Sequence, residues 1–250
     1  MNISFYNGVS GMLAYQESMS RISHNIANTN TIGFKPDRSN FSDLLYTRMA
    51  VNSEEQPLTG HGVKIEDSQL VYRQGAVLQT GLDLDYALIG DGFFAVERPS
   101  GNIEYTRNGA FDISIEGNKG YLVTADGSHV LDAAGRPIEL QRDSADGPFD
   151  LSGLEEQLGI YDFPNPFGLE HSTGNCFAAT ETSGEAVVVT LGSGAAFERE
   201  YRLLPGAVEQ SAVELSDEMV NVITTQKAFQ FNAKMVQTAD QLEEIINNLR

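Results

Sequence analysis

The sequence predicts an α+β protein in which long helices at both ends flank a mainly β centre. Residues 49–210 hold nine basic and 26 acidic side chains, whereas residues 1–48 carry a net charge of +1 and residues 211–250 a net charge of −3. The last 40 residues contain no glycine or proline, and their apolar residues recur every seven positions. We therefore expect an N-terminal helix with an extended segment in 1–48, a central β-rich domain in 49–210, and a C-terminal long helix in 211–250.

The N-terminal segment has the spacing of an amphipathic helix from about Phe5 to Ala27. Its apolar residues recur at intervals that place them on one face: Val9, Met12, Leu13, Met19, Ile22 and Ile26. Gly8 and Gly11 interrupt the first turns, and each costs about 1 kcal/mol of helix stability relative to alanine. The helix is therefore expected to form mainly through burial of its apolar face.

A run rich in asparagine and threonine follows this helix. Side chains of both types compete for backbone hydrogen bonds, and Gly33 permits a positive φ angle. We expect the helix to end near Asn28 or Asn30, and an extended segment over Phe34, Lys35 and Pro36.

The centre has the pattern of short strands separated by tight turns. The expected strands are 87–89, 93–97, 103–106, 110–115, 121–124 and 129–131, with a later group at 159–163, 177–180 and 187–191. Turns with positive φ are expected at Asp91-Gly92, Asn108-Gly109, Asn118-Lys119-Gly120 and Asp126-Gly127. A strand about every ten residues is typical of an antiparallel sandwich or barrel, and 141–153 is expected to be a loop or a link.

The C-terminal segment predicts one helix from about 213 to 249, roughly 55 Å long. Two series of apolar residues recur every seven positions along it: Leu215, Val222, Phe229, Val236, and Ala228, Met235, Leu242, Leu249. Heptad spacing favours packing against a partner helix. The two terminal helices can bury their apolar faces against each other or against neighbouring copies of the chain, and the spacing alone leaves both arrangements open.

Composition excludes several classes of protein. A net charge of −19 opposes nucleic-acid binding, which depends on lysine and arginine. The single cysteine, Cys176, excludes an internal disulfide and a CxxC metal or redox site. No apolar run is long enough to span a membrane, and no secretory signal is visible.

No motif indicates an active site, so we expect no catalytic residue, metal or cofactor. Gly8-Val9-Ser10-Gly11 is not a nucleophile elbow, and Gly90-Asp91-Gly92-Phe93 lacks the third glycine of a dinucleotide loop. The histidines are scattered. An acidic periplasmic hydrolase with paired carboxylates remains an alternative, but with 35 acidic residues such pairs arise by chance.

The chain resembles the axial proteins of the bacterial flagellum, the rod and hook subunits. The resemblance is carried by motifs in the family's order along nearly the whole chain: Ser10-Gly11-Met12-Leu13, Asn25-Ile26-Ala27-Asn28-Thr29-Asn30-Thr31-Ile32-Gly33-Phe34-Lys35, Ile89-Gly90-Asp91-Gly92-Phe93-Phe94, Tyr105-Thr106-Arg107-Asn108-Gly109, Asn165-Pro166-Phe167-Gly168-Leu169 and Asn232-Ala233-Lys234. The short length and the Asn-Pro-Phe-Gly-Leu run favour a rod protein over a hook protein, and a hook-type or adaptor axial subunit is the alternative.

The resemblance implies a structural, non-enzymatic subunit that polymerises helically into a hollow, torque-transmitting axis. Its terminal helices would form a coiled-coil-like inner core. Its partners would be copies of itself, neighbouring rod or hook proteins, and the type III export apparatus that carries it to the basal body without a cleaved signal. Neither nucleic acid nor membrane insertion is expected. The expected subunit-contact residues are Met12, Met19, Ile22, Asn25, Ile26, Asn28, Asn30, Gly33, Phe34, Leu215, Met219, Val222, Phe229, Met235, Val236, Leu242 and Leu249.

Overall fold

A computed structural model describes residues 3–48, 58–116, 119–140, 149, 151, 153–189 and 201–249. The chain divides into two compact units. The helical unit comprises Met1–Ala27, Asp37–Gln69 and Glu214–Arg250, and the β unit comprises Asn28–Pro36 and Leu70–Val213.

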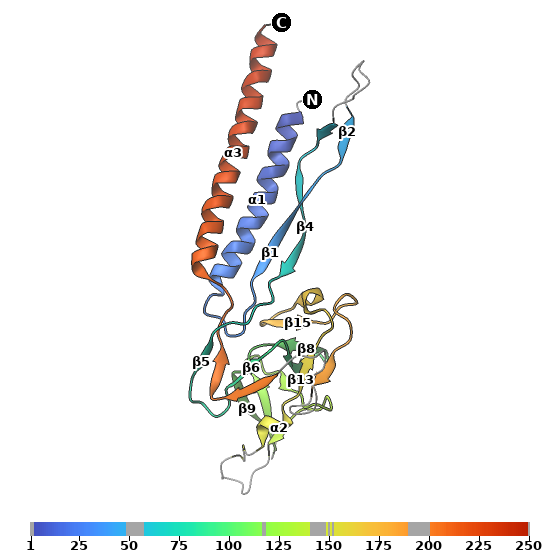
Figure 1. Ribbon diagram of the computed structural model, residues 1–250, viewed down its shortest axis with the longest axis vertical. Helices are drawn as coiled ribbons and strands as arrows, with labels where there is room; N and C mark the ends of the chain where they lie inside the picture. Colours follow the sequence, from blue (N-terminus) through green and yellow to red (C-terminus); the bar gives the residue numbers. More distant parts are fainter. Residues whose placement is uncertain are drawn as a thin grey trace. The chain divides into compact units, whose positions relative to one another are not determined.

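The helical unit contains two long helices and two narrow β ribbons (Figure 1). Helix α1 (Ile3–Ala27) and helix α3 (Leu215–Asn248) lie side by side. Strand β1 (Asp37–Asp43) pairs with β4 (Val63–Leu70), and β2 (Tyr46–Arg48) pairs with β3 (Leu58–Gly60). The Asn7 side-chain amide donates to the backbone oxygen of Gly60 at 3.0 Å, which ties the ribbon to α1.

Both predicted terminal helices are confirmed within about two residues at each end. The four ribbon strands were not predicted, because their sequences carry few apolar residues. Strand β1 has no buried residue, and β4 has one, Leu70, at its end. Such strands form by pairing with each other and packing on a helix, so an apolar pattern does not reveal them.

The β unit is built on one large sheet with short strands around it. The path through the sheet is β12-β10-β11-β7-β8-β15-β14, with β9 paired to β10, β13 to β7, and β16 to β13. Strands β17 and β18 pair with β6 and β5. The bounds are β5 Val77–Gln79, β6 Tyr86–Ile89, β7 Phe93–Glu97, β8 Ile103–Thr106, β9 Phe111–Glu116, β10 Lys119–Thr124, β11 His129–Val130, β12 Glu139–Leu140, α2 Leu154–Gln157, β13 Ile160–Asp162, the 3₁₀ helix η1 Pro166–Gly168, β14 Glu170–His171, β15 Cys176–Ala178, β16 Val187–Val189, β17 Arg202–Pro205 and β18 Ala207–Glu209.

Strand β7 supplies both hydrophobic cores of the β unit. Phe94 and Val96 belong to one cluster, whereas Phe93 and Ala95 belong to the other. Successive side chains of a strand point to opposite faces, so a strand buried on both faces is apolar at every position. This accounts for the unbroken Phe-Phe-Ala-Val run in the sequence.

The predicted central strands coincide with β6–β11, β13, β15 and β16, and the α+β class with a mainly β centre is confirmed. The predicted turns are partly wrong. Among the glycines of the four predicted turns, positive φ is found at Gly127. Gly109 lacks it, and a Cβ there would lie 1.7 Å from the Tyr86 carbonyl oxygen, so this position needs glycine for close approach. Most of the predicted 141–153 link lies outside the described residues.

Candidate subunit-contact site

The candidate contact residues are divided between the two units. Thirteen of the 17 lie on the helices: Met12, Met19, Ile22, Asn25 and Ile26 on α1, with Leu215, Met219, Val222, Phe229, Met235, Val236 and Leu242 on α3 and Leu249 at its C-cap. The other four, Asn28, Asn30, Gly33 and Phe34, belong to the β unit. Of the 13 helical residues, the structure buries two (Ile22 and Asn25), leaves five half-buried and exposes six. The half-buried residues are Met12, Met19, Ile26, Val222 and Val236.

Helices α1 and α3 run antiparallel and approach closely through two glycines. A Cβ on Gly8 would lie 2.7 Å from Cγ2 of Val236, and a Cβ on Gly11 would lie 2.8 Å from the Asn232 side-chain oxygen. At the other end of α1, the Asn25 amide donates to a carboxylate oxygen of Glu218 at 3.0 Å. Gly8 and Gly11, which weaken the helix locally, are therefore needed for the approach of α3.

The contact between the two helices is built from small and polar residues. The buried residues of α1 are Gly8, Gly11, Ala14, Ser18, Ile22 and Asn25. Those of α3 are Glu218, Thr225 and Ala239. Of the predicted contact residues, Ile22 and Asn25 are buried here, and Val222 and Val236 are half-buried. The seam therefore differs from the large apolar series that the heptad spacing singles out.

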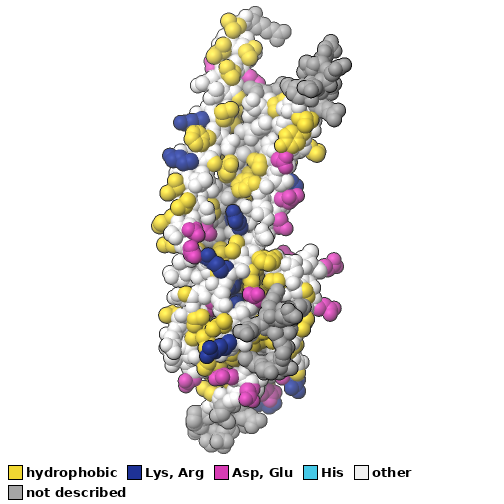
Figure 2. Space-filling view, in the orientation of Figure 1, with side chains coloured by type: hydrophobic (Ala, Val, Ile, Leu, Met, Phe, Trp, Pro, Cys, Tyr) yellow, Lys and Arg dark blue, Asp and Glu magenta, His cyan; other side chains and the backbone are white. Residues whose placement is uncertain are grey.

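Most of the large apolar side chains of α3 are exposed, and Figure 2 shows apolar side chains at the surface of the helical unit. Met219 and Met235 are each 55% exposed, and Leu249 is 84% exposed. The exposed set is Leu215, Met219, Val220, Ile223, Phe229, Phe231, Met235, Leu242, Ile245, Ile246 and Leu249. On α1 the exposed set is Ile3, Phe5, Tyr6 and Leu13. Exposed apolar side chains in such number are typical of interaction surfaces, so these residues are candidates for contact with another molecule.

The four candidates in the β unit take part in its internal structure. Gly33 has a φ of +68°, as expected, and its N–H donates to the Glu209 carbonyl at 2.8 Å. Phe34 is 5% exposed, and its carbonyl accepts from the Ala212 N–H at 2.9 Å. Asn28 is half-buried and Asn30 is exposed. A contact between these residues and a neighbouring subunit stays a prediction.

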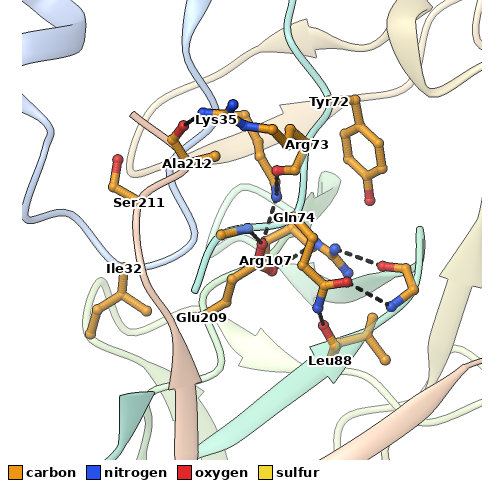
Figure 3. A network of polar contacts seen from close by, with 12 residues as sticks. Ile32, Lys35, Tyr72, Arg73, Gln74, Leu88, Arg107, Glu209, Ser211 and Ala212 are labelled. Atoms are coloured by element: carbon orange, nitrogen blue, oxygen red, sulfur yellow. Dashed lines mark hydrogen bonds and ion pairs between the residues drawn. The ribbon is translucent and has the colours of Figure 1, made fainter. Parts of the chain in front are cut away.

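A buried ionic network in the β unit was missed by the sequence analysis. Lys35 Nζ lies 2.6 Å from Glu209 Oε1, and Arg107 Nε lies 3.1 Å from Glu209 Oε2 (Figure 3). All three side chains are at most 1% exposed. The Gly75 N–H also donates to Glu209 Oε1, at 2.7 Å. One carboxylate thus joins segments that are far apart in the sequence.

Backbone carbonyls and an aromatic ring complete the network. Lys35 donates to the carbonyl of Arg73 at 2.6 Å, and Arg107 donates to the carbonyls of Gly92 and Gly90 at 2.7 and 2.6 Å. Both cationic groups lie within 6 Å of the Tyr72 ring centre. Buried charges require such partners, because an unpaired charge in the interior is very costly.

The network places two cations against one carboxylate, and the ionisation of Lys35 reflects this. Burial and, after it, the nearby Arg107 charge lower the pKa of the Lys35 ammonium to about 8, although Glu209 acts in the opposite direction. Burial also raises the pKa of the Tyr72 hydroxyl. No sequence pattern signals this cluster, because Lys35 and Glu209 are 174 positions apart.

The one cysteine of the chain, Cys176, is a buried free thiol. Burial raises the pKa of the Cys176 thiol to about 11, which opposes thiolate formation near neutral pH. In the described part of the chain, no group of three or more His, Cys, Asp or Glu side chains is placed to hold a metal ion. None of the described helices is long and apolar enough to cross a membrane.

Two family models match this chain, one over part of the β unit and one over the C-terminal region that contains α3. Residues 204–249 match the family model "Flagellar basal body rod FlgEFG protein C-terminal", and residues 87–153 match "Flagellar hook protein FlgE/F/G D1 domain". The flagellar basal-body rod protein FlgG of Borreliella burgdorferi is 34% identical, with 99% of this chain and 98% of that protein covered. The FlgG proteins of Bacillus subtilis and Agrobacterium fabrum are each 33% identical, over 98% and 95% of both chains.

Proposed function

The chain belongs to the flagellar basal-body rod protein family and is a structural subunit of that rod, and we propose that it polymerises helically through the outer faces of its two terminal helices. The polymer is a hollow shaft that transmits torque. In this polymer the terminal helices pack against each other within one subunit and also against the terminal helices of neighbouring subunits, and together they form the predicted coiled-coil-like core. Met12, Met19 and the outward residues of α3 are its contacts.

The observation that carries this proposal is the division of residue types in the helical unit. The seam between α1 and α3 contains small and polar groups, while Phe231 and Ile246 are 65% and 64% exposed. Burying a large aliphatic or aromatic side chain contributes about 1.5–3 kcal/mol. These side chains stay exposed when a single chain folds, so the free energy of burying them becomes available only when copies of the chain associate.

The outward residues of α3 point in more than one direction, which favours a polymer over a closed dimer. At about 100° per residue, Met219 and Leu242 point about 140° apart around the helix. A two-fold dimer contact buries the side chains on one side of α3. Burying the side chains on both sides requires two different neighbouring subunits. Heterologous contacts that do not close generate helical filaments.

As a rod protein the chain functions in the flagellar basal body together with other axial components. We infer that its direct partners are copies of itself and the adjoining rod or hook proteins, and that the type III export apparatus delivers it without a cleaved signal. A seam of small residues suits such delivery, because a helix pair with little buried apolar surface separates at low cost. The role proposed is mechanical and involves no catalysis.

The test is electron microscopy of the purified chain at rising concentration, with two variants that add the same charge. Ile245→Glu places a carboxylate on an outward apolar position that is 55% exposed. Asn247→Glu, the matched control, adds it two residues further on at an exposed polar position. We expect filaments from the unaltered chain and from Asn247→Glu but none from Ile245→Glu, because burying an unpaired charge is costly. Filaments from Ile245→Glu at unchanged concentration contradict the proposal.

A further inference from the structure

The contact between α1 and α3 contains a polar clamp at one end. Asn25, 1% exposed, donates from its amide to Glu218 Oε1 at 3.0 Å and to the Asp37 carbonyl at 2.9 Å. Its side-chain oxygen accepts from the Asp37 N–H at 3.0 Å. The Asn25 amide thus uses its donors and its acceptor to join α1, the start of β1 and α3.

The clamp is one of three heptad-spaced positions along the seam that carry no large apolar side chain. Gly11 faces Asn232, and Asn25 faces Glu218. Midway between them, Ser18 and Thr225 occupy the same register and are 7% and 8% exposed. Each of these positions is seven residues from the next on both helices. Two helices with such a repeat can slide past each other by one heptad and still place small residues together.

We propose that Asn25 and Glu218 are positioning residues that hold α1 and α3 in a single register. A slide of one heptad in either direction separates Asn25 from Glu218 and leaves a buried donor and a buried carboxylate without each other. Leaving such groups unpaired is costly, and a buried asparagine fixes register in coiled coils in this way. At the heptad-spaced positions, Gly11, Ser18 and Thr225 are small and discriminate weakly between registers.

The register matters because it determines the outer surface, an argument that rests on the proposed function. A slide of seven residues moves the exposed side chains of α3 by about 10 Å relative to those of α1. A helical polymer requires every subunit to present the same surface. By this inference the clamp contributes specificity to the helix pair, while the apolar residues outside supply the free energy of assembly.

Engineered cysteine pairs test the register in the purified full-length chain. The pair Ser18→Cys and Thr225→Cys reports the observed register. In the observed register, which is defined by Gly11 opposite Asn232 and Asn25 opposite Glu218, residue 229 lies opposite Ala14. A slide of one heptad brings residue 236 or residue 222 opposite Ala14 instead. Ala14→Cys combined with Val236→Cys, or with Val222→Cys, therefore reports a slide in one direction or the other. Cys176→Ala in every arm leaves no other thiol, since Cys176 is the single native cysteine. Internal disulfides are measured by gel mobility after mild oxidation.

Two backgrounds separate the clamp from general stability. Asn25→Leu with Glu218→Leu replaces the clamp by apolar groups, whereas Glu218→Gln keeps an oxygen that accepts from Asn25. We expect the native chain and Glu218→Gln to form the Ser18–Thr225 cross-link alone, and the double variant to increase the shifted cross-links roughly tenfold or more. Circular dichroism checks that the helices remain.

Three outcomes overturn the inference: a double variant that keeps the single register, a double variant that loses its helices, or shifted cross-links already formed by the native chain. Filament formation is scored separately by electron microscopy. A chain that keeps one register but forms no filaments contradicts the proposed function and leaves the positioning role standing.

Discussion

The two units of this protein bury different kinds of residue. The β unit encloses Phe93, Phe94 and Phe177 at 0% exposure, and it pairs its buried charges internally. The helical unit does the reverse, because its internal seam is small and polar while Phe231 and Leu249 face outward. The β unit therefore buries its large apolar side chains within itself, whereas under the proposed function the helical unit completes its burial against neighbouring subunits.

Two phenylalanines give the largest contrast between the units. Phe93→Ala removes a fully buried ring from the core and is expected to lower the free energy of unfolding by about 3–5 kcal/mol. Phe231→Ala removes a ring that is 65% exposed and is expected to leave unfolding nearly unchanged while raising the concentration needed for filaments. Urea unfolding and sedimentation of filaments measure the two effects. Equal losses of stability would remove the distinction between the units.

Removing the carboxylate of the ionic network tests how much the buried ion pairs contribute to the stability of the β unit. Glu209→Gln leaves the buried Lys35 and Arg107 charges without a counter-charge, so we expect a loss of about 3–5 kcal/mol of unfolding free energy. Glu139→Gln is the matched control, because Glu139 forms an ion pair with Lys119 in which both side chains are about half exposed. Urea unfolding followed by circular dichroism is the measurement. A loss in Glu209→Gln no greater than that of the control would assign the network a minor role.

The pH dependence of stability gives the smallest effect. Lys35 has a pKa of about 8 in the folded chain against an ordinary lysine value of 10.5, so between these values the unfolded chain binds more protons. Stability therefore rises as the pH increases from 8 toward 10, by on the order of 2 kcal/mol. Lys35→Met removes this rise. Above pH 10 the buried Tyr72 hydroxyl opposes it, because its pKa is raised in the folded state. A fall in stability between pH 8 and 10 in the native chain would contradict the assignment.

The helical unit illustrates what periodicity can and cannot predict. The absence of breakers and the apolar spacing located α1 and α3, since helix formation depends on residues close in sequence. The same spacing placed Val222 and Phe229 in one seven-residue series and Met235 in the other, and it left open whether they face the other terminal helix or a neighbouring copy. In the structure Val222 is half-buried, whereas Met235 is 55% exposed. Heptads do not reveal which of two faces turns toward the partner helix.

Strands were predicted where they are apolar and missed where they are not. Strand β7 of the β unit was recognised because it is buried on both faces. Strand β1 of the helical unit was missed because none of its residues is buried and it forms by pairing with β4 beside α1. Lys35 was noted in a family motif, but its link to Glu209 depends on the folding of distant segments. The family resemblance thus pointed to Lys35, whereas its partner Glu209 became apparent only in the folded structure.

The sequence by itself determined the two terminal helices, the central strands and the family resemblance, because each depends on residues a few positions apart or on motifs in a fixed order. The tertiary structure decided that glycines and polar groups form the seam between α1 and α3, and that Lys35, Arg107 and Glu209 meet in the β unit. Such contacts join residues more than 70 positions apart, and their free energies depend on burial and geometry that only the folded chain creates.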